Sequence, residues 1–298
     1  MSETSTITCV GEILWDALPA GLFLGGAPLN VCLNLNQLGE EATIVSRVGK
    51  DRLGNEALRR LKTAGLNTDF IQKDDSRETG FVKVELGSEG DPEYEIIQPV
   101  AWDFIDLSDN SIRNLLQHSW AVVYGTLAHR ANPSLKGLLD LECLKALDMN
   151  LRSPYYEKDQ VVQLVEHSDL LKMNEAELGL LQKWCSLPAG MEEAVSAISK
   201  RFGCRTVCVT MGGKGSVLFH DNKWFEHPGY PTEVVDAVGA GDAFFAALLH
   251  GLKSGRADNQ LLPLANAAGA YVAARRGANP EYSVSDLESI MQGSHSPQ

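Results

Sequence analysis

The stretch DAVGAGDAFF, residues 236–245, is the part of the chain that decides its fold. Asp242 directly follows Gly239, Ala240 and Gly241, and an apolar run typical of a helix comes next. Glycines before a helix let backbone N–H groups converge at its N-terminus, where the helix dipole adds partial positive charge. Such a turn can hold an anion, and Asp242 could accept a proton there, as phosphoryl transfer to an alcohol requires. Asp242 could equally well cap the helix, since Asp is a favoured capping residue.

Composition and charge narrow the class of protein. The chain has 298 residues, 44% of them hydrophobic, which suffices for the core of one large α/β domain. Its formal net charge of −13 argues against a nucleic-acid partner and against an anionic membrane surface.

The cysteines and the N-terminus bear on the compartment. The chain has 6 cysteines without a CxxC pair, which predicts free thiols in a reducing environment. The first residues lack a basic segment followed by an apolar core, and no apolar run approaches about 18 residues. We therefore expect a cytoplasmic protein without a membrane span.

Strand-like and helix-like segments alternate along most of the chain. This alternation predicts a mainly parallel sheet with helices on both of its faces. The expected strands span residues 7–10, 42–48, 120–124, 146–151 and 206–210, and the expected helices span 28–38, 53–64 and 243–252.

One region departs from that alternation. Residues 79–86 and 93–97 each alternate apolar and polar side chains, and the turn GSEGDP (87–92) separates them. The pattern predicts a hairpin with one dry face and one wet face. Such an insertion could be a lid over a site at the sheet edge, or an edge hairpin that only caps the core.

Two further glycine-rich segments are candidate binding sites. In VTMGGKGSVLF, Thr210 ends a strand, and Gly212 and Gly215 lie in the turn that follows, as in a nucleotide-binding turn or an ordinary hairpin. In the N-terminal third, Asp16 follows the first strand, and GGAPLN places Asn30 in the first turn of a helix. An Asp and an Asn beside exposed backbone N–H groups could bind the hydroxyls of a polyol, or they could be a loop carboxylate and a helix cap.

Four motifs together resemble the signatures of the ribokinase-like (phosphofructokinase-B type) carbohydrate kinases. DAVGAGDAFFAALLHG (236–251) is similar to the family's D-T-x-G-A-G-D element, and GGAPLNVCLNLNQLG (25–39) with VGKDRLG (48–54) is similar to its N-terminal signature. KMNEAEL (172–178) resembles the N-x-x-E motif, and VTMGGKG (209–215) resembles the nucleotide-binding turn. The four occur in the family's order over nearly the whole chain.

The resemblance implies a role for each matched position. Asp242 would be the general base, ATP the phosphoryl donor and Mg²⁺ the metal cofactor. The implied residues are Gly239, Ala240 and Gly241 for the anion hole; Asp16, Gly25, Gly26, Asn30 and Asp236 for the sugar; Asn174 and Glu177 for Mg²⁺ and its waters; and Asn174, Thr210, Gly212, Gly215, Gly241 and Asn266 for ATP.

The resemblance also implies a fold. We expect a three-layer α/β/α domain over residues 1–298, with a mainly parallel central sheet and a small β-sheet lid built from segments 13–24 and 77–106. Family members often pair their lids, so a homodimer through the lid is an expectation. Many members bind a monovalent cation such as K⁺ near Asp236 and the stretch ARRGANPE (274–281), but here Glu281 stands where a smaller polar residue is common.

The substrate is less sharply indicated. LDMNLRSPYY places Asp148, Asn150 and Arg152 at alternate positions of an expected strand end, hence on one face. This resembles an element of fructokinases and of 2-keto-3-deoxygluconate kinases, in which an Arg can pair with a substrate carboxylate or with ATP phosphates. PVAWDFI looks fructokinase-like, with Trp102 or Asp103 facing the sugar unless Trp102 only packs in the core.

Fructose is therefore the first expected substrate, 2-keto-3-deoxygluconate the second and ribose the third. The expected reaction transfers the γ-phosphoryl group of ATP to a primary hydroxyl of the sugar. A rival of another class is a sugar-sensing regulator that keeps the kinase fold without the activity. A nucleotide-binding oxidoreductase is disfavoured because GxGxxG does not follow the first strand.

Overall fold

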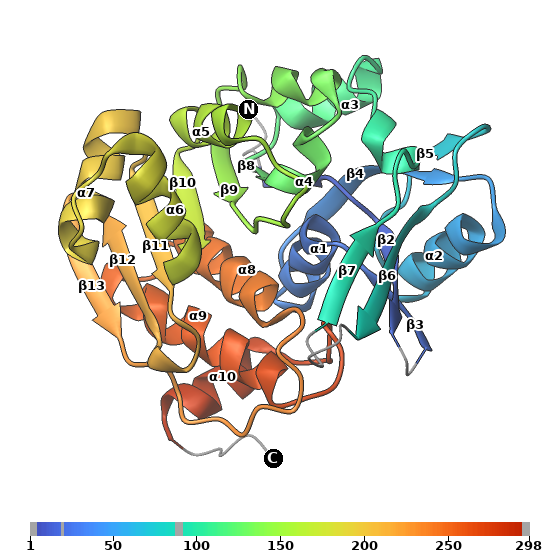
Figure 1. Ribbon diagram of the computed structural model, residues 1–298. Helices are drawn as coiled ribbons and strands as arrows, with labels where there is room; N and C mark the ends of the chain where they lie inside the picture. The colour runs from blue at the N-terminus through green and yellow to red at the C-terminus, as the bar shows by residue number, and fades with distance from the viewer. Residues whose placement is uncertain (1–4, 19–20, 87–91, 294–298) are drawn as a thin grey trace.

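The main element of the computed structural model, which describes residues 5–18, 21–86 and 92–293, is a large central sheet (Figure 1). Within those residues its strands are β1 (Ile7–Val10), β4 (Ala42–Gly49), β5 (Ile71–Asp74), β8 (Ala121–Gly125), β9 (Leu144–Asp148), β10 (Leu170–Asn174), β11 (Thr206–Thr210), β12 (Ser216–His220) and β13 (Lys223–His227). Their order is β13-β12-β11-β10-β9-β8-β1-β4-β5. The run from β11 to β5 is parallel, and β12 and β13 are antiparallel.

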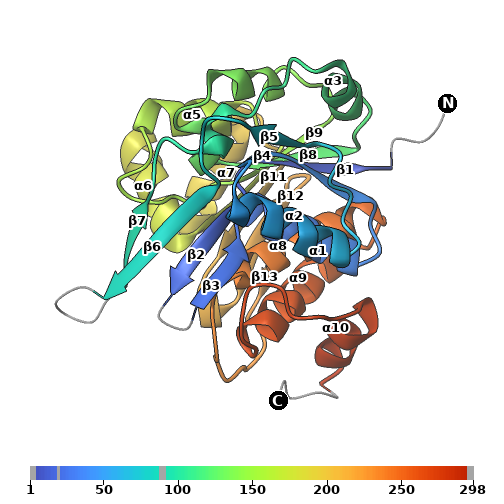
Figure 2. The same cartoon turned by 90° about the vertical axis from the view of Figure 1, so that its right-hand side faces the viewer.

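Helices cover both faces of this sheet, which makes three layers (Figures 1 and 2). One face packs against α1 (Ala27–Gln37), α2 (Arg52–Thr63), α8 (Ala240–Lys253), α9 (Asp258–Ala273) and α10 (Val284–Met291). The other packs against α3 (Asn110–Gln117), α4 (Thr126–His129), α5 (Lys158–Glu166), α6 (Glu175–Cys185) and α7 (Met191–Phe202). Three short 3₁₀ turns complete the described helices: η1 (Ala101–Phe104), η2 (Pro133–Leu138) and η3 (Gly212–Lys214).

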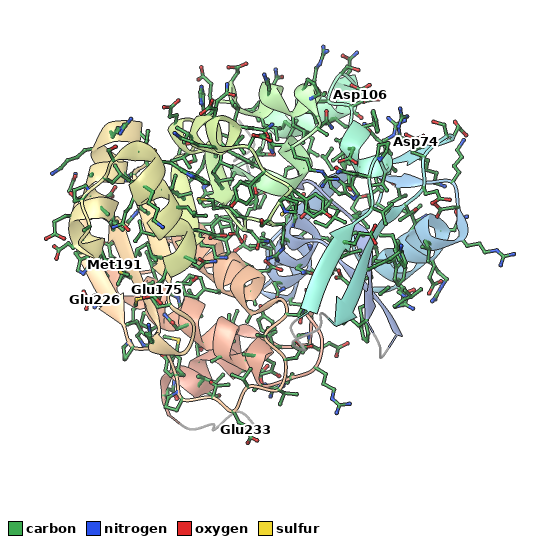
Figure 3. All side chains as sticks on the ribbon, in the orientation of Figure 1. Asp74, Asp106, Glu175, Met191, Glu226 and Glu233 are labelled. Carbon is green, nitrogen blue, oxygen red and sulfur yellow. The ribbon has the colours of Figure 1, made fainter. Side chains whose placement is uncertain are left out.

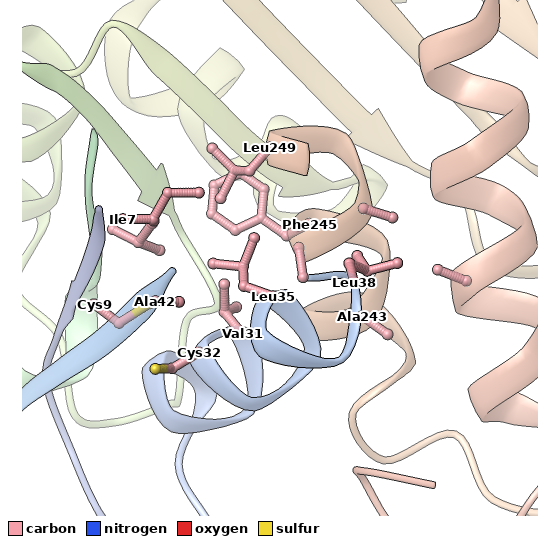
Figure 4. Packing of buried hydrophobic residues seen from close by; sticks show 14 of the residues in the cluster. Ile7, Cys9, Val31, Cys32, Leu35, Leu38, Ala42, Ala243, Phe245 and Leu249 are labelled. Atoms are coloured by element: carbon pink, nitrogen blue, oxygen red, sulfur yellow. The ribbon is translucent and has the colours of Figure 1, made fainter. Parts of the chain in front are cut away.

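In the hydrophobic core on one face of the sheet, α1 from the N-terminal part of the chain packs against α8 from the C-terminal part. Val31 and Leu35 of α1 lie against Phe245 and Leu249 of α8, with Ile7 of β1 beside them (Figure 4). All five side chains are 0–1% exposed. Burial of side chains of this size contributes about 1.5–3 kcal/mol each, so this contact holds α8 firmly against α1.

A second, smaller sheet projects from the main body (Figure 2). Its strands are β2 (Leu14–Leu18), β3 (Gly21–Gly25), β6 (Gly80–Leu86) and β7 (Pro92–Ile96), in the order β3-β2-β6-β7. β2 pairs with β6 in parallel, and the other two pairings are antiparallel. Val82 and Ile96 are buried and Lys83 is exposed, as the predicted hairpin requires; its turn at 87–91 lies outside the described residues.

The prediction of an α/β fold with a mainly parallel sheet is confirmed, and the strands 7–10 and 206–210 have the predicted bounds. One prediction about a strand end is wrong. β9 ends at Asp148, and Asn150 has a positive φ of 34°, so Asp148, Asn150 and Arg152 do not alternate along one strand. No helix in the described part of the chain combines the length and apolar character that crossing a bilayer requires.

Candidate active site

The N-terminus of α8 has no side-chain cap. Gly239 is the N-cap residue, with a left-handed φ of 79°, so Ala240, Gly241 and Asp242 form the first turn. A Cβ on Gly239 would lie 2.5 Å from Cα of Ala278, so no larger residue fits there. The prediction that the helix begins at 243 is wrong, and so is the alternative that Asp242 caps it. The N–H of Ala240 donates to the carbonyl oxygen of Ala237 at 3.3 Å, whereas the N–H groups of Gly241 and Asp242 have no intrahelical partner and can receive an anion.

Asp242 is buried and has one side-chain partner from α1. Its Oδ2 accepts a hydrogen bond from Nδ2 of Asn30 at 2.8 Å. Burial, and next the negative charge of Asp148, raise the pKa of the Asp242 carboxyl to about 7, against the opposing effects of Lys172, Asn30 and Arg152. A carboxyl group with a pKa near neutrality is well placed to accept a proton and release it again.

A buried ion pair that the sequence analysis missed lies beside this turn. Nζ of Lys172 donates to both carboxylate oxygens of Asp148, at 3.0 and 2.9 Å, across the neighbouring strands β10 and β9. A Cβ on Gly241 would lie 3.1 Å from this Nζ, so the cation lies against the anion-binding turn. Burial alone would lower the pKa of Lys172, but Asp148 and Asp242 raise it, and the ammonium stays charged. A lysine inside the apolar strand LLKMN was the only signal in the sequence.

Of the predicted sugar-binding residues in the N-terminal third, Asn30 contacts Asp242, and Asp16 lies against Gly25 just before α1. Asp16 lies on β2, and a Cβ on Gly25 would lie 2.7 Å from its Oδ2. Gly26 caps α1 with φ 119°, and a Cβ there would lie 2.2 Å from the carbonyl oxygen of Glu12. Burial raises the pKa of Asp16 to about 6, and the charge of Arg152 opposes that rise.

Arg152 acts on both carboxyls of this region. Its positive charge opposes the rise in the pKa of Asp16 and of Asp242, so the guanidinium lies within electrostatic range of both groups. The side chain is exposed to solvent.

Trp102 and Asp103 of η1 are less accessible than predicted. Trp102 is 0% exposed and Asp103 is 2% exposed. Arg130 places its guanidinium 4.0 Å from the centre of the Trp102 ring and binds Asp103 at 3.0 Å. The structure thus favours the core-packing alternative for Trp102, and it gives the Asp103 carboxylate a protein partner.

Asn174 and Glu177 form a reciprocal cap at the start of α6. Oδ1 of Asn174 accepts from the Glu177 N–H at 2.9 Å, and Oε2 of Glu177 accepts from the Asn174 N–H at 2.8 Å. Oε1 of Glu177 accepts from the N–H of Leu151 at 2.7 Å. Both carboxylate oxygens are therefore already bound to backbone groups, and each keeps a second lone pair.

The predicted nucleotide-binding residues lie at the carboxyl end of β11. Thr210 ends this strand, Gly212 begins η3 and Gly215 follows it, with φ values of 56° and 89° for the two glycines. A Cβ on Gly215 would lie 1.9 Å from the carbonyl oxygen of His227, so this turn requires glycine. Asn266, on α9, donates to Ser216 Oγ at 2.7 Å.

Asp236 holds a loop together. Its two carboxylate oxygens each accept a 3.0 Å hydrogen bond, from the N–H groups of Val238 and Gly277. The structure thus gives this predicted substrate-binding residue two backbone partners.

Charged side chains lie both on the surface and in the interior of the molecule. Acidic side chains such as Glu226 and Glu233 lie on the outer rim (Figure 3), whereas Asp148, Lys172 and Asp242 are buried together at the carboxyl ends of the strands. Among the described residues, no group of three His, Cys, Asp or Glu side chains could hold a metal ion by itself. The site combines an anion-binding helix N-terminus, the buried cation of Lys172 and the proton acceptor Asp242. These three groups suit the transfer of an anionic group to a hydroxyl.

Known proteins are similar to this chain in sequence and in fold. A fructokinase of Escherichia coli is 26% identical over 299 residues, 92% of this chain and 95% of its own. The structure of a fructokinase from Vibrio cholerae O395, with fructose, ADP and calcium ion bound, superposes with a TM-score of 0.82 at 22% identity, covering 97% of this chain and 100% of its own. The structure of 2-dehydro-3-deoxygluconokinase from Thermotoga maritima gives 0.81 at 18% identity, covering 97% and 98%.

These likenesses establish the ribokinase-like fold. The pfkB family of carbohydrate kinases matches residues 20–284, nearly the full length. The chain belongs to the pfkB family of carbohydrate kinases.

Proposed function

We propose that this protein is a fructokinase, which transfers the γ-phosphoryl group of ATP to a primary hydroxyl of fructose. Asp242 takes the proton of that hydroxyl, and the N–H groups of Gly239, Ala240 and Gly241 hold the transferred phosphoryl group. The observation that carries the proposal is the buried Asp242 carboxyl, with its pKa near 7, in the first turn of an uncapped helix. Relatives named fructokinase over nearly the full chain support the choice of sugar.

The sugar binds between Asp16, Gly25, Gly26 and Asn30 in this proposal. Asp16 supplies acceptors for hydroxyl hydrogens, and Asn30 holds the Asp242 carboxylate in place. The small sheet carries Asp16 and acts as a lid that excludes water while the phosphoryl group moves.

ATP binds along Thr210, Gly212 and Gly215, with the adenine near Asn266. Protein-bound Mg²⁺ usually keeps several waters and binds substrate phosphates. Glu177, which has a free lone pair on each carboxylate oxygen, and Asn174 would hold such waters. When bound, Mg²⁺ neutralises phosphate charge. Our proposal does not include activation by K⁺ at Asp236 and the 274–281 stretch.

A second candidate substrate is 2-keto-3-deoxygluconate. The observation that favours it is Arg152, an exposed guanidinium within electrostatic range of Asp16 and Asp242, which could pair with a substrate carboxylate. Ribose is the third candidate. A regulator without catalytic activity is the alternative of another class.

We also propose that the lids of two copies pair. β3 is an edge strand of the small sheet, and its Leu22 and Phe23 are 45% and 41% exposed. An exposed, apolar edge strand is a surface that a second chain can cover.

The experiment measures ADP release by the purified protein with Mg²⁺-ATP and one sugar at a time: fructose, 2-keto-3-deoxygluconate, ribose, then a nucleoside. We expect the highest kcat/KM with fructose, and we expect turnover in Asp242→Asn to be lower by about 10²-fold or more. A preference for the acid sugar would replace the first candidate by the second. Sugar binding without turnover on any substrate would support the regulator.

A further inference from the structure

A chain of side-chain amides reaches Asp242 from the C-terminal part of the protein. Asn30 donates from Nδ2 to Asp242, and its Oδ1 accepts from Nδ2 of Asn279 at 2.8 Å. Oδ1 of Asn279 accepts from Nδ2 of Asn34 at 3.0 Å, and Oδ1 of Asn34 accepts from the Tyr282 hydroxyl at 2.6 Å. Four hydrogen bonds thus lie in series, and all four donors point toward the carboxylate.

The direction of this chain is fixed at one point by the backbone. Nδ2 of Asn34 also donates to the carbonyl oxygen of Asn30 at 2.7 Å. A carbonyl oxygen only accepts, so Asn34 has to turn its NH₂ group toward it and its Oδ1 toward Tyr282. This choice sets the amide of Asn279, which in turn sets the amide of Asn30.

The far end of the chain reinforces the same direction. Tyr282 is buried, and burial raises the pKa of its hydroxyl well above the ordinary value, so the group remains a donor. Asn34 is 0% exposed and Asn30 is 5% exposed, so water cannot easily replace either partner. Aligned hydrogen bonds polarise one another, which strengthens the last bond to the carboxylate.

We propose that Asn279 and Asn34 are positioning residues for phosphoryl transfer: they hold the Asn30 amide with its NH₂ group toward Asp242 and so keep the carboxylate oriented and ionised. This inference rests on the proposed role of Asp242 as the base. The groups that face Asp242 from the other packed elements are Asp148 on β9, Arg152 after β9 and Lys172 on β10, and the variants below leave them unchanged.

The test reverses the direction of the hydrogen bond between residue 279 and Asn30. Asn279→Asp has no donor for Oδ1 of Asn30, so the Asn30 amide turns over and presents its oxygen to Asp242. We expect kcat to fall about tenfold or more, because a hydrogen bond to a charged group is lost, with a smaller change in KM for the sugar. The acid limb of the kcat/KM profile moves to higher pH, because a carboxylate without its donor binds a proton more tightly.

Matched variants separate the effect of hydrogen-bond direction from the effects of net charge and of side-chain packing. Asn279→Asp combined with Glu281→Gln restores the net charge of the segment, and we expect it to retain the defect. Asn279→Leu removes the donor without reversing the Asn30 amide, so its defect is smaller. Tyr282→Phe removes only the far end of the chain and keeps the buried ring, so it has the smallest effect. Thermal unfolding of each variant shows whether the fold survives.

The outcomes distinguish this inference from the proposed function. If Asp242→Asn is inactive while Asn279→Asp keeps the wild-type kcat and pH profile, the positioning role is wrong and the base assignment stands. Equal defects in Asn279→Asp and Asn279→Leu, with no shift of the acid limb, would also overturn it. Turnover within a few fold of wild type in Asp242→Asn would remove the foundation for both.

Discussion

The helices α6 and α8 both begin near the carboxyl ends of the sheet strands, but their first turns differ. α6 starts with Asn174 and Glu177, which satisfy each other's backbone N–H groups. α8 starts with Gly239 and has no side-chain cap, although Asp242 stands in its first turn. Both sequences place acidic groups at a helix start, yet only one of them uses these groups to complete the helix.

The difference indicates that the glycine-rich start of α8 leaves backbone N–H groups for a ligand. A side-chain cap stabilises a helix by about 1 kcal/mol. α8 has no such cap and lacks this contribution. Its stability comes instead from the apolar face that packs on α1. The open N–H groups then remain available to a ligand, and the Asp242 carboxylate turns to Asn30.

The largest effect is expected from Asp242→Asn. The variant keeps an acceptor for Asn30 but cannot take a proton, so kcat falls by about 10²-fold or more. Steady-state ADP release measures this, and circular dichroism checks the fold. A variant with near-normal turnover would mean that the uncapped helix serves some purpose other than base catalysis.

Gly239→Ala tests the shape of the same turn. The left-handed φ and the 2.5 Å approach to Ala278 predict a loss of about 1–3 kcal/mol in the free energy of unfolding, together with lower kcat. Gly255→Ala is the matched control, because Gly255 has φ 67° but nothing within 4 Å of its Cβ position. Urea denaturation compares the two. Equal losses would show that backbone strain alone, and not the contact with Ala278, requires glycine.

The pH dependence of stability tests whether the pKa of Asp242 is raised in the folded protein. Its folded pKa of about 7 lies above the ordinary value of 3.8, so the folded protein binds the proton more tightly than the unfolded chain does. This contribution to stability is present at low pH and is lost as the pH rises through about 7. We expect the Tm of Asp242→Asn, relative to the unaltered protein, to rise between pH 4 and 7 and to level off above. A constant difference across this range would contradict the raised pKa.

The smallest effect is expected at α6. Asn174→Ala removes the cap and costs about 1 kcal/mol of stability, whereas Asn174→Ser keeps it. Thermal unfolding measures the difference. If both variants raise the KM for Mg²⁺-ATP by a similar factor, Asn174 acts on the nucleotide as well as on the helix.

Local signals in the sequence were sufficient for most of the fold. Alternating strands and helices predicted the layered sheet, and the glycines around Asp242 predicted an open helix N-terminus. The end of β9 was missed because Asn150 adopts a positive φ, which the alternation of side chains does not reveal.

Partners that are distant in sequence could not be predicted. Lys172 received no role in the sequence analysis beyond its place in KMNEAEL, because its partner Asp148 belongs to another strand. The contacts of Asn279 with Asn30 and Asn34 join residues 249 and 245 positions apart. Such contacts exist only after the sheet has brought α1 beside the C-terminal segment.

The separation of Asn30 and Asp242 also has a consequence for synthesis. The two residues are 212 positions apart, and the amide chain closes only with Tyr282. The ribosome therefore completes β2, β3 and α1 long before the carboxylate and its last partner exist. Contacts that close so long a loop form late in folding. The growing polypeptide can thus carry the N-terminal half of its site through most of translation, and it becomes a catalyst only when the final helices dock.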